Sequence, residues 1–447
     1  MTQVPEVSEV RAQALAAREA SRFLAVTDAS VRDGLLRTLA DLLVAEAPTI
    51  LAANAQDLAS AEGTLGPSAF QRLKLDARKL EEMAAGVRAV AALPDPLNRL
   101  QLHRELDAGL ELRRVTCPLG VLGVVFESRP DALIQISALA LKSGNAVLLK
   151  GGREARHSHA ALLRVVHRAL EAADLPGAAV QGLADRSSVE AMLGLHDLVD
   201  LVIPRGSKAL VSHIQASTRI PVLGHADGIC HMYLDAAADP AMAVALVRDA
   251  KLQYPAACNA VETVLLHEAA APSLLPALAV DLGPEVELRG CDCCRALVPD
   301  LHPATDDDWD AEYGEPILAL KVVRNLDEAL AHIRRHGSGH TEAIVTEDPA
   351  AAARFLAEVD AAGVFHNAST RFADGFRYGF GAEVGISTGR LHARGPVGLE
   401  GLLSYRYLLA GQGHRVGDYT GPGARPFTHR MLSLQETLPP PDAGGLS

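Results

Sequence analysis

The sequence lacks the features that define several large classes of protein. Its 447 residues carry 42 Lys and Arg against 55 Asp and Glu, and this absence of basic excess argues against nucleic-acid binding. No apolar run approaches the roughly 20 residues that a membrane helix needs. The first residues show no basic patch followed by an apolar segment, so we expect no secretory signal. Six cysteines are too few for a disulfide scaffold, which predicts a reduced, cytoplasmic protein.

Two common nucleotide-binding motifs are also missing. No Gly-x-Gly-x-x-Gly follows the first expected strand, and no Gly-Lys-Ser/Thr occurs anywhere. The segment GISTG (385–389) matches the nucleophile elbow of hydrolases, but that elbow needs a strand before it and a helix after it. A Gly-rich stretch precedes this segment and Gly395-Pro396 follows it, so the pattern does not favour a hydrolase.

The apolar content of 49% is enough for a large core, and the length suggests about three domains. Residues 1 to about 100 show the three-to-four-residue spacing of helices. Short buried-strand runs then alternate with helical segments, which predicts an α/β protein with a doubly wound parallel sheet. A second α/β region begins near residue 235. The expected flanking pieces are an exposed strand at 106–115, a helix at 397–404, a strand at 405–410 and a mobile tail after 413.

Two groups of potential metal ligands do not have the pattern of a metal site. His332, His336 and His340 are spaced by four, but Gly337 and Gly339 interrupt the helix that would bring them together. The segment CDCC (291–294) has no second Cys pair, which a structural zinc site normally requires. We therefore expect no bound metal.

Cys258 lies in the segment QYPAACNA (253–260), between an expected helix and an expected buried strand. Small neighbours leave such a thiol open to attack a carbonyl carbon, provided that a nearby cation or a depressed pKa favours the thiolate. By itself, the segment favours a buried structural cysteine over a reactive one.

With these motifs in view, the chain resembles the aldehyde dehydrogenase superfamily and, within it, the gamma-glutamyl phosphate reductase family. The resemblance extends over nearly the whole chain. The stretch ALAHIRRHGSGHTE (329–342) is similar to that family's own signature, and the resemblance is also dense at 124–132, 139–152, 254–262 and 363–401. That family lacks the usual glycine fingerprint, so its absence here is expected.

The resemblance implies an aldehyde-dehydrogenase-like fold in three parts. These are a nucleotide-binding domain (1–105 and 117–234), a catalytic domain (235–395) and an oligomerisation element (106–116 and 396–413), followed by a tail (414–447). Exposed strand edges in the oligomerisation element imply a homodimer or a higher assembly.

The resemblance also implies NADP as the cofactor and L-glutamate 5-phosphate as the substrate. Cys258 would attack the acyl phosphate, release phosphate and form a thioester that NADPH reduces to glutamate 5-semialdehyde, the second step of proline biosynthesis. The oxyanion of the tetrahedral intermediates needs hydrogen-bond donors, and the Cys258 backbone N–H is one candidate. Many relatives have Asn at the position of Ser128, so the second donor is either Ser128 or Asn259. The implied cofactor residues are Lys150, Arg153, Gly206, Ser207 and Glu312, and the substrate candidates are Arg129, Asn367, Ser369, Thr370 and Arg371.

Two other functions remain open from the sequence. One is an aldehyde dehydrogenase that releases a free acid, which would need a base where this chain reads LGHADG (223–228), without Glu. His225 and Asp227 are the candidates for that base. The other is a catalytically silent nucleotide-binding or scaffold protein, which the presence of Cys258 argues against.

Overall fold

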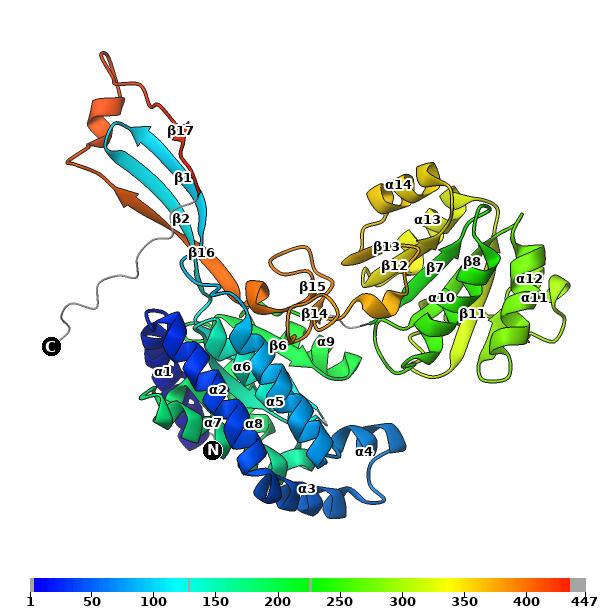
Figure 1. Ribbon diagram of the computed structural model, residues 1–447, viewed down its shortest axis with the longest axis horizontal. Helices are drawn as coiled ribbons and strands as arrows, with labels where there is room; N and C mark the ends of the chain where they lie inside the picture. Colours follow the sequence, from blue (N-terminus) through cyan, green and yellow to red (C-terminus); the bar gives the residue numbers. More distant parts are fainter. Residues whose placement is uncertain (1–3, 128, 225–226, 435–447) are drawn as a thin grey trace.

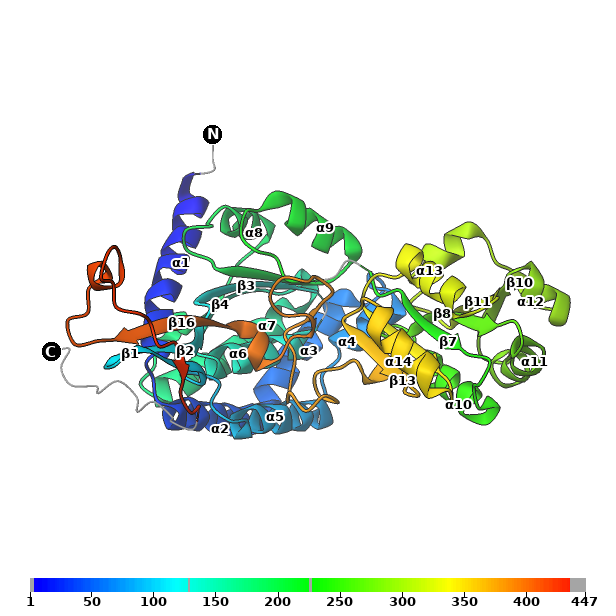
Figure 2. The same cartoon turned by 90° about the horizontal axis from the view of Figure 1, so that it is seen from above.

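The computed structural model describes residues 4–127, 129–224 and 227–434. Its strands form two parallel sheets, one antiparallel sheet and a two-stranded ribbon. Both views place the parallel sheets side by side (Figures 1 and 2), and Figure 1 shows the antiparallel sheet projecting away from them. None of the helices in the described part of the chain is long and apolar enough to cross a membrane.

The described residues that precede β1 form five helices and their connections, in agreement with the prediction. Within α2, the leucines that recur along one face, such as Leu35, Leu39 and Leu43, are buried against the first sheet's core. The Asp76 side chain caps α5 by accepting a hydrogen bond from the Lys79 N–H. The helices are α1 (Val4–Leu24), α2 (Ala29–Ala45), α3 (Ala47–Ala61), α4 (Pro67–Leu73) and α5 (Ala77–Ala92).

The first parallel sheet has the order β5-β4-β3-β6. Successive residues of β3 enter different cores: Leu122 and Val124 face α6 and α7, while Val121 and Val125 face α1, α8 and α9. Helices therefore cover both faces, and the doubly wound prediction is confirmed. The elements are β3 (Val121–Phe126), α6 (Pro130–Lys142), β4 (Ala146–Lys150), α7 (Arg156–Ala172), β5 (Val180–Gly182), α8 (Arg186–Leu193), β6 (Leu201–Arg205) and α9 (Lys208–Ser217).

The second parallel sheet has the order β10-β9-β11-β8-β7-β12-β13. One face packs on α10, α11 and α12 and the other on α13 and α14. The elements are β7 (Cys230–Leu234), α10 (Pro240–Leu252), β8 (Val261–His267), α11 (Ala271–Leu282), β9 (Glu287–Gly290), α12 (Asp292–Leu297), β10 (His302–Pro303), β11 (Ile317–Val323), α13 (Leu326–His336), β12 (Thr341–Val345), α14 (Pro349–Glu358) and β13 (Gly363–His366).

The antiparallel sheet corrects three expectations. The single strand expected at 106–115 is a hairpin, β1 (Leu100–Asp107) and β2 (Leu110–Pro118), whose turn needs the positive φ of Gly109. The helix expected at 397–404 is a single 3-10 turn, η5 (Leu399–Leu402), before β16 (Leu403–Ala410). The start of the tail is ordered, since β17 (Arg430–Met431) pairs with β1.

The two-stranded ribbon, β14 (Ile386–Ser387) and β15 (Gly395–Pro396), lies between the two parallel sheets in both views (Figures 1 and 2). This segment of the chain connects the second parallel sheet to the antiparallel sheet, and its Val384 packs in the core of the first parallel sheet.

Candidate active site

A buried ion pair brackets the segment that carries Cys258. Lys251, at the end of α10, donates to Glu262, at the start of β8, over 2.5 Å, and both side chains are 0% exposed. Burial raises the pKa of Glu262 to about 7 and lowers the pKa of Lys251, while their mutual attraction favours the charged forms. The pair therefore joins the two ends of the intervening segment, within which Cys258 lies.

The Cys258 backbone is packed directly against Gly228. A Cβ atom at residue 228 would lie 2.2 Å from the Cys258 carbonyl oxygen and 2.7 Å from its Cα, so only glycine fits. The Gly228 N–H donates to Glu312 Oε2 at 2.9 Å, and the Cys230 thiol donates to the Cys258 carbonyl at 3.4 Å. These contacts bring Glu312, one of the predicted cofactor residues, to the Cys258 segment.

Two arginines lie close enough to interact electrostatically with the Cys258 sulfur. Burial lowers the pKa of Arg205 and of Arg371. The negative charge of an ionised Cys258 acts in the opposite direction and raises both pKa values. Arg205 Nη2 in turn lies 3.9 Å from the Glu383 carboxylate. The positive charge of Arg129 acts to lower the pKa of both Arg205 and Glu383. Cationic side chains therefore lie near the Cys258 sulfur.

The loop after β13 reaches the same place through its second half. Arg371 Nε donates to Gln253 Oε1 at 2.9 Å, and Asn259 Nδ2 donates to the Ala373 carbonyl at 2.8 Å. Ser369 and Thr370 are buried beside them.

Asn367, by contrast, lies at the opposite end of the strands. Its side chain accepts a hydrogen bond from the Thr346 N–H and donates one to the Thr346 carbonyl, just beyond β12. Asn367 is thus separated from Ser369, Thr370 and Arg371, while Arg129 lies at the start of α6 on the first sheet.

The remaining predicted cofactor residues lie at the carboxyl ends of strands in the first sheet. Lys150 ends β4, where burial lowers its pKa, and the exposed Arg153 follows in a 3-10 turn. Gly206 and Ser207 connect β6 to α9. Their position is at the point where the strand order reverses around β3, which is where open α/β sheets usually bind ligands.

Glu127 shares that position. Its Oε2 accepts a hydrogen bond from the Ser207 N–H at 2.9 Å, at the positive end of α9. Sequence reasoning missed Glu127 and Arg205. Each directly follows or ends a buried parallel strand, which is the signal that would have identified them.

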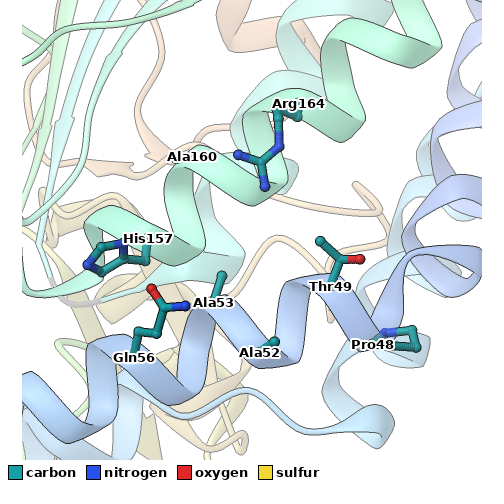
Figure 3. Close-up of a pocket in the computed structure, with 8 residues that line it drawn as sticks. All are labelled: Pro48, Thr49, Ala52, Ala53, Gln56, His157, Ala160 and Arg164. Carbon is teal, nitrogen blue, oxygen red and sulfur yellow. The ribbon is translucent and has the colours of Figure 1, made fainter.

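Other candidates lie elsewhere or outside the described residues. Ser128 and His225 are not among those residues, and Asp227 forms an ion pair with Lys208 at 2.8 Å. His332 packs on His336 and Trp309, and no group of three or more His, Cys, Asp or Glu in the described ranges is placed to hold a metal ion. A hollow of about 520 Å³ between α3 and α7 is lined by Gln56, His157, Arg164 and smaller side chains and contains none of the predicted site residues (Figure 3).

Comparison with known proteins gives this geometry a context. Residues 2–282 match the model of the aldehyde dehydrogenase family. The gamma-glutamyl phosphate reductase of Synechococcus sp. (strain JA-2-3B'a(2-13)) is 60% identical over 422 residues, which is 93% of this chain and 92% of that protein. The crystal structure of gamma-glutamyl phosphate reductase from Thermotoga maritima is 40% identical, with a TM-score of 0.89, over 91% of this chain and 99% of that one.

The chain belongs to the gamma-glutamyl phosphate reductase family of the aldehyde dehydrogenases. The resemblance stated from the sequence is therefore confirmed. In this member of the family, two features of the Cys258 segment can be tested directly: the ion pair that brackets it and the glycine that it packs on.

We expect Lys251→Met to reduce the free energy of unfolding by about 3–5 kcal/mol, because it leaves the Glu262 carboxylate buried without its cationic partner. Urea denaturation measures the change. The double variant Lys251→Met/Glu262→Leu should recover most of the loss, since it removes both charges. A single variant as stable as the wild type would contradict the role assigned to the pair.

We expect Gly228→Ala to leave the fold intact, by circular dichroism, but to slow alkylation of the Cys258 thiol at least tenfold. The added methyl group collides with Cys258 backbone atoms, so Cys258 must move from its present position. Gly177→Ala is the matched control, because nothing lies within 4 Å of a Cβ at that position. Equal alkylation rates in both variants would show that Gly228 does not position Cys258.

Proposed function

We propose that this chain reduces L-glutamate 5-phosphate to L-glutamate 5-semialdehyde, with release of phosphate, in the second step of proline biosynthesis. The observation that carries the proposal is the 60% identity, over nearly the whole chain, to a gamma-glutamyl phosphate reductase. The environment of Cys258, with its fixed backbone and two nearby guanidinium groups, supports it chemically.

Cys258 is the proposed nucleophile. Its thiolate attacks the acyl carbon, the bond from that carbon to the phosphate oxygen breaks, and inorganic phosphate leaves with the electron pair. The product on the enzyme is a thioester. Reduction of the thioester gives the aldehyde and frees the Cys258 sulfur, which lies near Arg205 and Arg371.

The tetrahedral oxyanion that precedes the thioester requires hydrogen-bond donors, and one such donor is typically worth about 3 kcal/mol. The Cys258 backbone N–H is the first candidate, since its position is fixed by Gly228. Because the Asn259 amide already donates to the Ala373 carbonyl, we favour Ser128 as the second donor.

The substrate carries a phosphoryl group, an α-carboxylate and an α-ammonium group. Arg129, Arg205 and Arg371 form a cationic group near Cys258, suited to the two anionic parts. We assign the phosphoryl group to Arg205, which the Glu383 carboxylate orients. Ser369 and Thr370 are polar residues of the same loop as Arg371. Asn367 is the least suited of the predicted residues to bind substrate, because its side chain already hydrogen-bonds the Thr346 backbone.

Aldehyde dehydrogenases use a nicotinamide cofactor, and for this chain we propose NADPH. The donor set fits an anionic dinucleotide: Lys150 ends β4, Gly206 and Ser207 open α9, and Glu312 lies beside the Cys258 segment, where it suits the nicotinamide ribose. When bound, the cofactor supplies a hydride. Arg153 provides a guanidinium group for a 2′-phosphate, and Glu127 must release the Ser207 N–H for the pyrophosphate.

The same site argues against the hydrolytic alternative. Water attacks a thioester rapidly only when a general base activates it. The described part of the segment 223–228 contains no Glu, and the one described carboxylate there, Asp227, is paired with Lys208. Phosphate should therefore be the acyl acceptor in the reverse reaction.

We expect oxidation of glutamate 5-semialdehyde to depend on inorganic phosphate. Initial rates of NADPH formation should saturate with phosphate and fall toward zero without it, and arsenate should substitute for phosphate. Cys258→Ser, the control, should be inactive under all conditions, because an alcohol is far less ionised than a thiol. Undiminished oxidation to free glutamate in phosphate-free buffer would establish the hydrolytic function instead.

We expect Arg153→Ala to weaken NADPH binding about tenfold and NADH binding much less, since a charge-assisted hydrogen bond to an exposed phosphate is worth roughly 1.5 kcal/mol. Fluorescence titration with both cofactors measures the difference. Arg156→Ala, a second exposed arginine nearby, is the control. Equal loss for both cofactors would remove Arg153 from the 2′-phosphate.

We also propose a cytoplasmic homo-oligomer in which the first parallel sheet binds the nucleotide, the second carries catalysis and the antiparallel sheet mediates assembly. The supporting observation is β16, which pairs with β2 on one edge and exposes Tyr405, Tyr407 and Leu409. Unpaired apolar strand edges associate readily.

Leu409→Asp should therefore shift the protein toward smaller species in sedimentation velocity, because a buried, unpaired charge opposes association. Leu409 is 60% exposed, and the control is Leu391→Asp, at a residue that is 92% exposed and lies outside the named strands. A monomeric wild type would contradict the assembly, and an unchanged oligomer in Leu409→Asp would place the interface elsewhere.

A further inference from the structure

Three cysteines that the proposed reaction does not use lie at the carboxyl end of β9. Cys291 directly precedes α12, and Cys294 lies within that helix, one turn further on. Their sulfur atoms are 3.6 Å apart. Cys293, between them in the sequence, is exposed, and all three are free thiols.

The two neighbouring sulfurs differ in accessibility. Cys291 is half-buried, whereas Cys294 is 0% exposed and its sulfur lies 3.3 Å from the Leu320 carbonyl oxygen. A hydrogen bond with Cys294 lowers the pKa of Cys291 to about 5 and raises the pKa of Cys294. The accessible Cys291 thiol therefore ionises more readily than the shielded Cys294 thiol.

We propose that Cys291 and Cys294 form a dithiol site that reacts with low-molecular-weight disulfides and closes to an intramolecular disulfide. The Cys291 thiolate attacks one sulfur of the external disulfide and expels one thiolate, which leaves a mixed disulfide. Cys294 then loses its proton and attacks Cys291 Sγ, and the second external thiolate leaves. Two protein thiols are oxidised and one external disulfide is reduced to two thiols.

The local geometry permits this closure. A disulfide needs Cα atoms about 4.4–6.8 Å apart, a separation that residues i and i+3 on one helical turn satisfy. The sulfurs need to approach by about 1.5 Å, which a side-chain rotation of Cys291 can supply, since its backbone is extended rather than helical. A Cβ on Gly290 would lie 2.8 Å from Cys294 Cβ, so the glycine leaves the room that Cys294 needs.

This site is separate from the proposed active site. Cys258 precedes the amino end of β8, and Cys291 follows the carboxyl end of β9, a strand of the same parallel sheet. Helix α12 lies on the far side of the second sheet from the first sheet in both views (Figures 1 and 2). Oxidation at Cys291 can therefore be measured independently of Cys258 and of the proposed reaction.

The test treats the Cys258→Ser variant of the full chain with oxidised glutathione at pH 7, followed by alkylation and mass spectrometry. Trypsin releases residues 290–295, which contain all three cysteines, and the expected product is this peptide with one internal disulfide and one alkylated Cys293. Adding Cys294→Ser should trap a glutathione adduct on Cys291. Adding Cys291→Ser should abolish the disulfide, and Cys293→Ser, the matched control, should leave it unchanged.

The pH dependence provides a second readout. Between pH 8 and pH 6, the reaction rate of free cysteine, with a pKa near 8.5, should fall about seventy-fold, whereas the Cys291 rate should change less than twofold. An adduct on Cys293 in the Cys294→Ser variant, a disulfide that survives Cys291→Ser, or a rate that follows that of free cysteine would each overturn the proposal.

Discussion

The buried ion pair between Lys251 and Glu262 is the interaction on which the candidate active site depends. Each charge would cost several kcal/mol to bury alone, so the pair is stable only when both partners are present. Because one partner ends α10 and the other begins β8, the pair holds together the two ends of the segment that carries Cys258. The fixed segment then provides the surface against which Gly228 packs, and Gly228 in turn brings Glu312 to the same place.

The site lies where two parallel sheets present opposite ends to each other. The first sheet contributes the carboxyl ends of β3, β4 and β6, where Glu127, Lys150 and Ser207 lie. The second sheet contributes the amino ends of β8 and β11, where Cys258 and Glu312 lie. A nucleotide suits the first set, because helix N-termini and Lys favour anions. A reactive thiol suits the second set, because the loop after β13 brings the positively charged Arg371 close to Cys258. The proposed reaction at Cys258 would therefore use groups from both sheets.

Several elements follow from local sequence alone. The runs at 146–150, 261–267 and 317–323 are strands with the predicted bounds, because short apolar segments between helices have few other stable arrangements. The hairpin at 100–118 was missed because its residues alternate weakly and its turn depends on one glycine. The segment 397–404 has helical composition, but it connects to β16, whose pairing with β2 limits it to a single turn.

The sequence by itself determined the family and most of the alternating strands and helices of the two parallel sheets, because these depend on motifs and spacings along the chain. It also singled out Cys258 as the proposed nucleophile. Only the tertiary structure decided which charges surround Cys258. Arg205 and Arg371 are far from it in the sequence, and Glu127 reaches Ser207 only through the pairing of β3 with β6. Electrostatic interactions depend on distance and burial, and both are set by packing rather than by the local sequence.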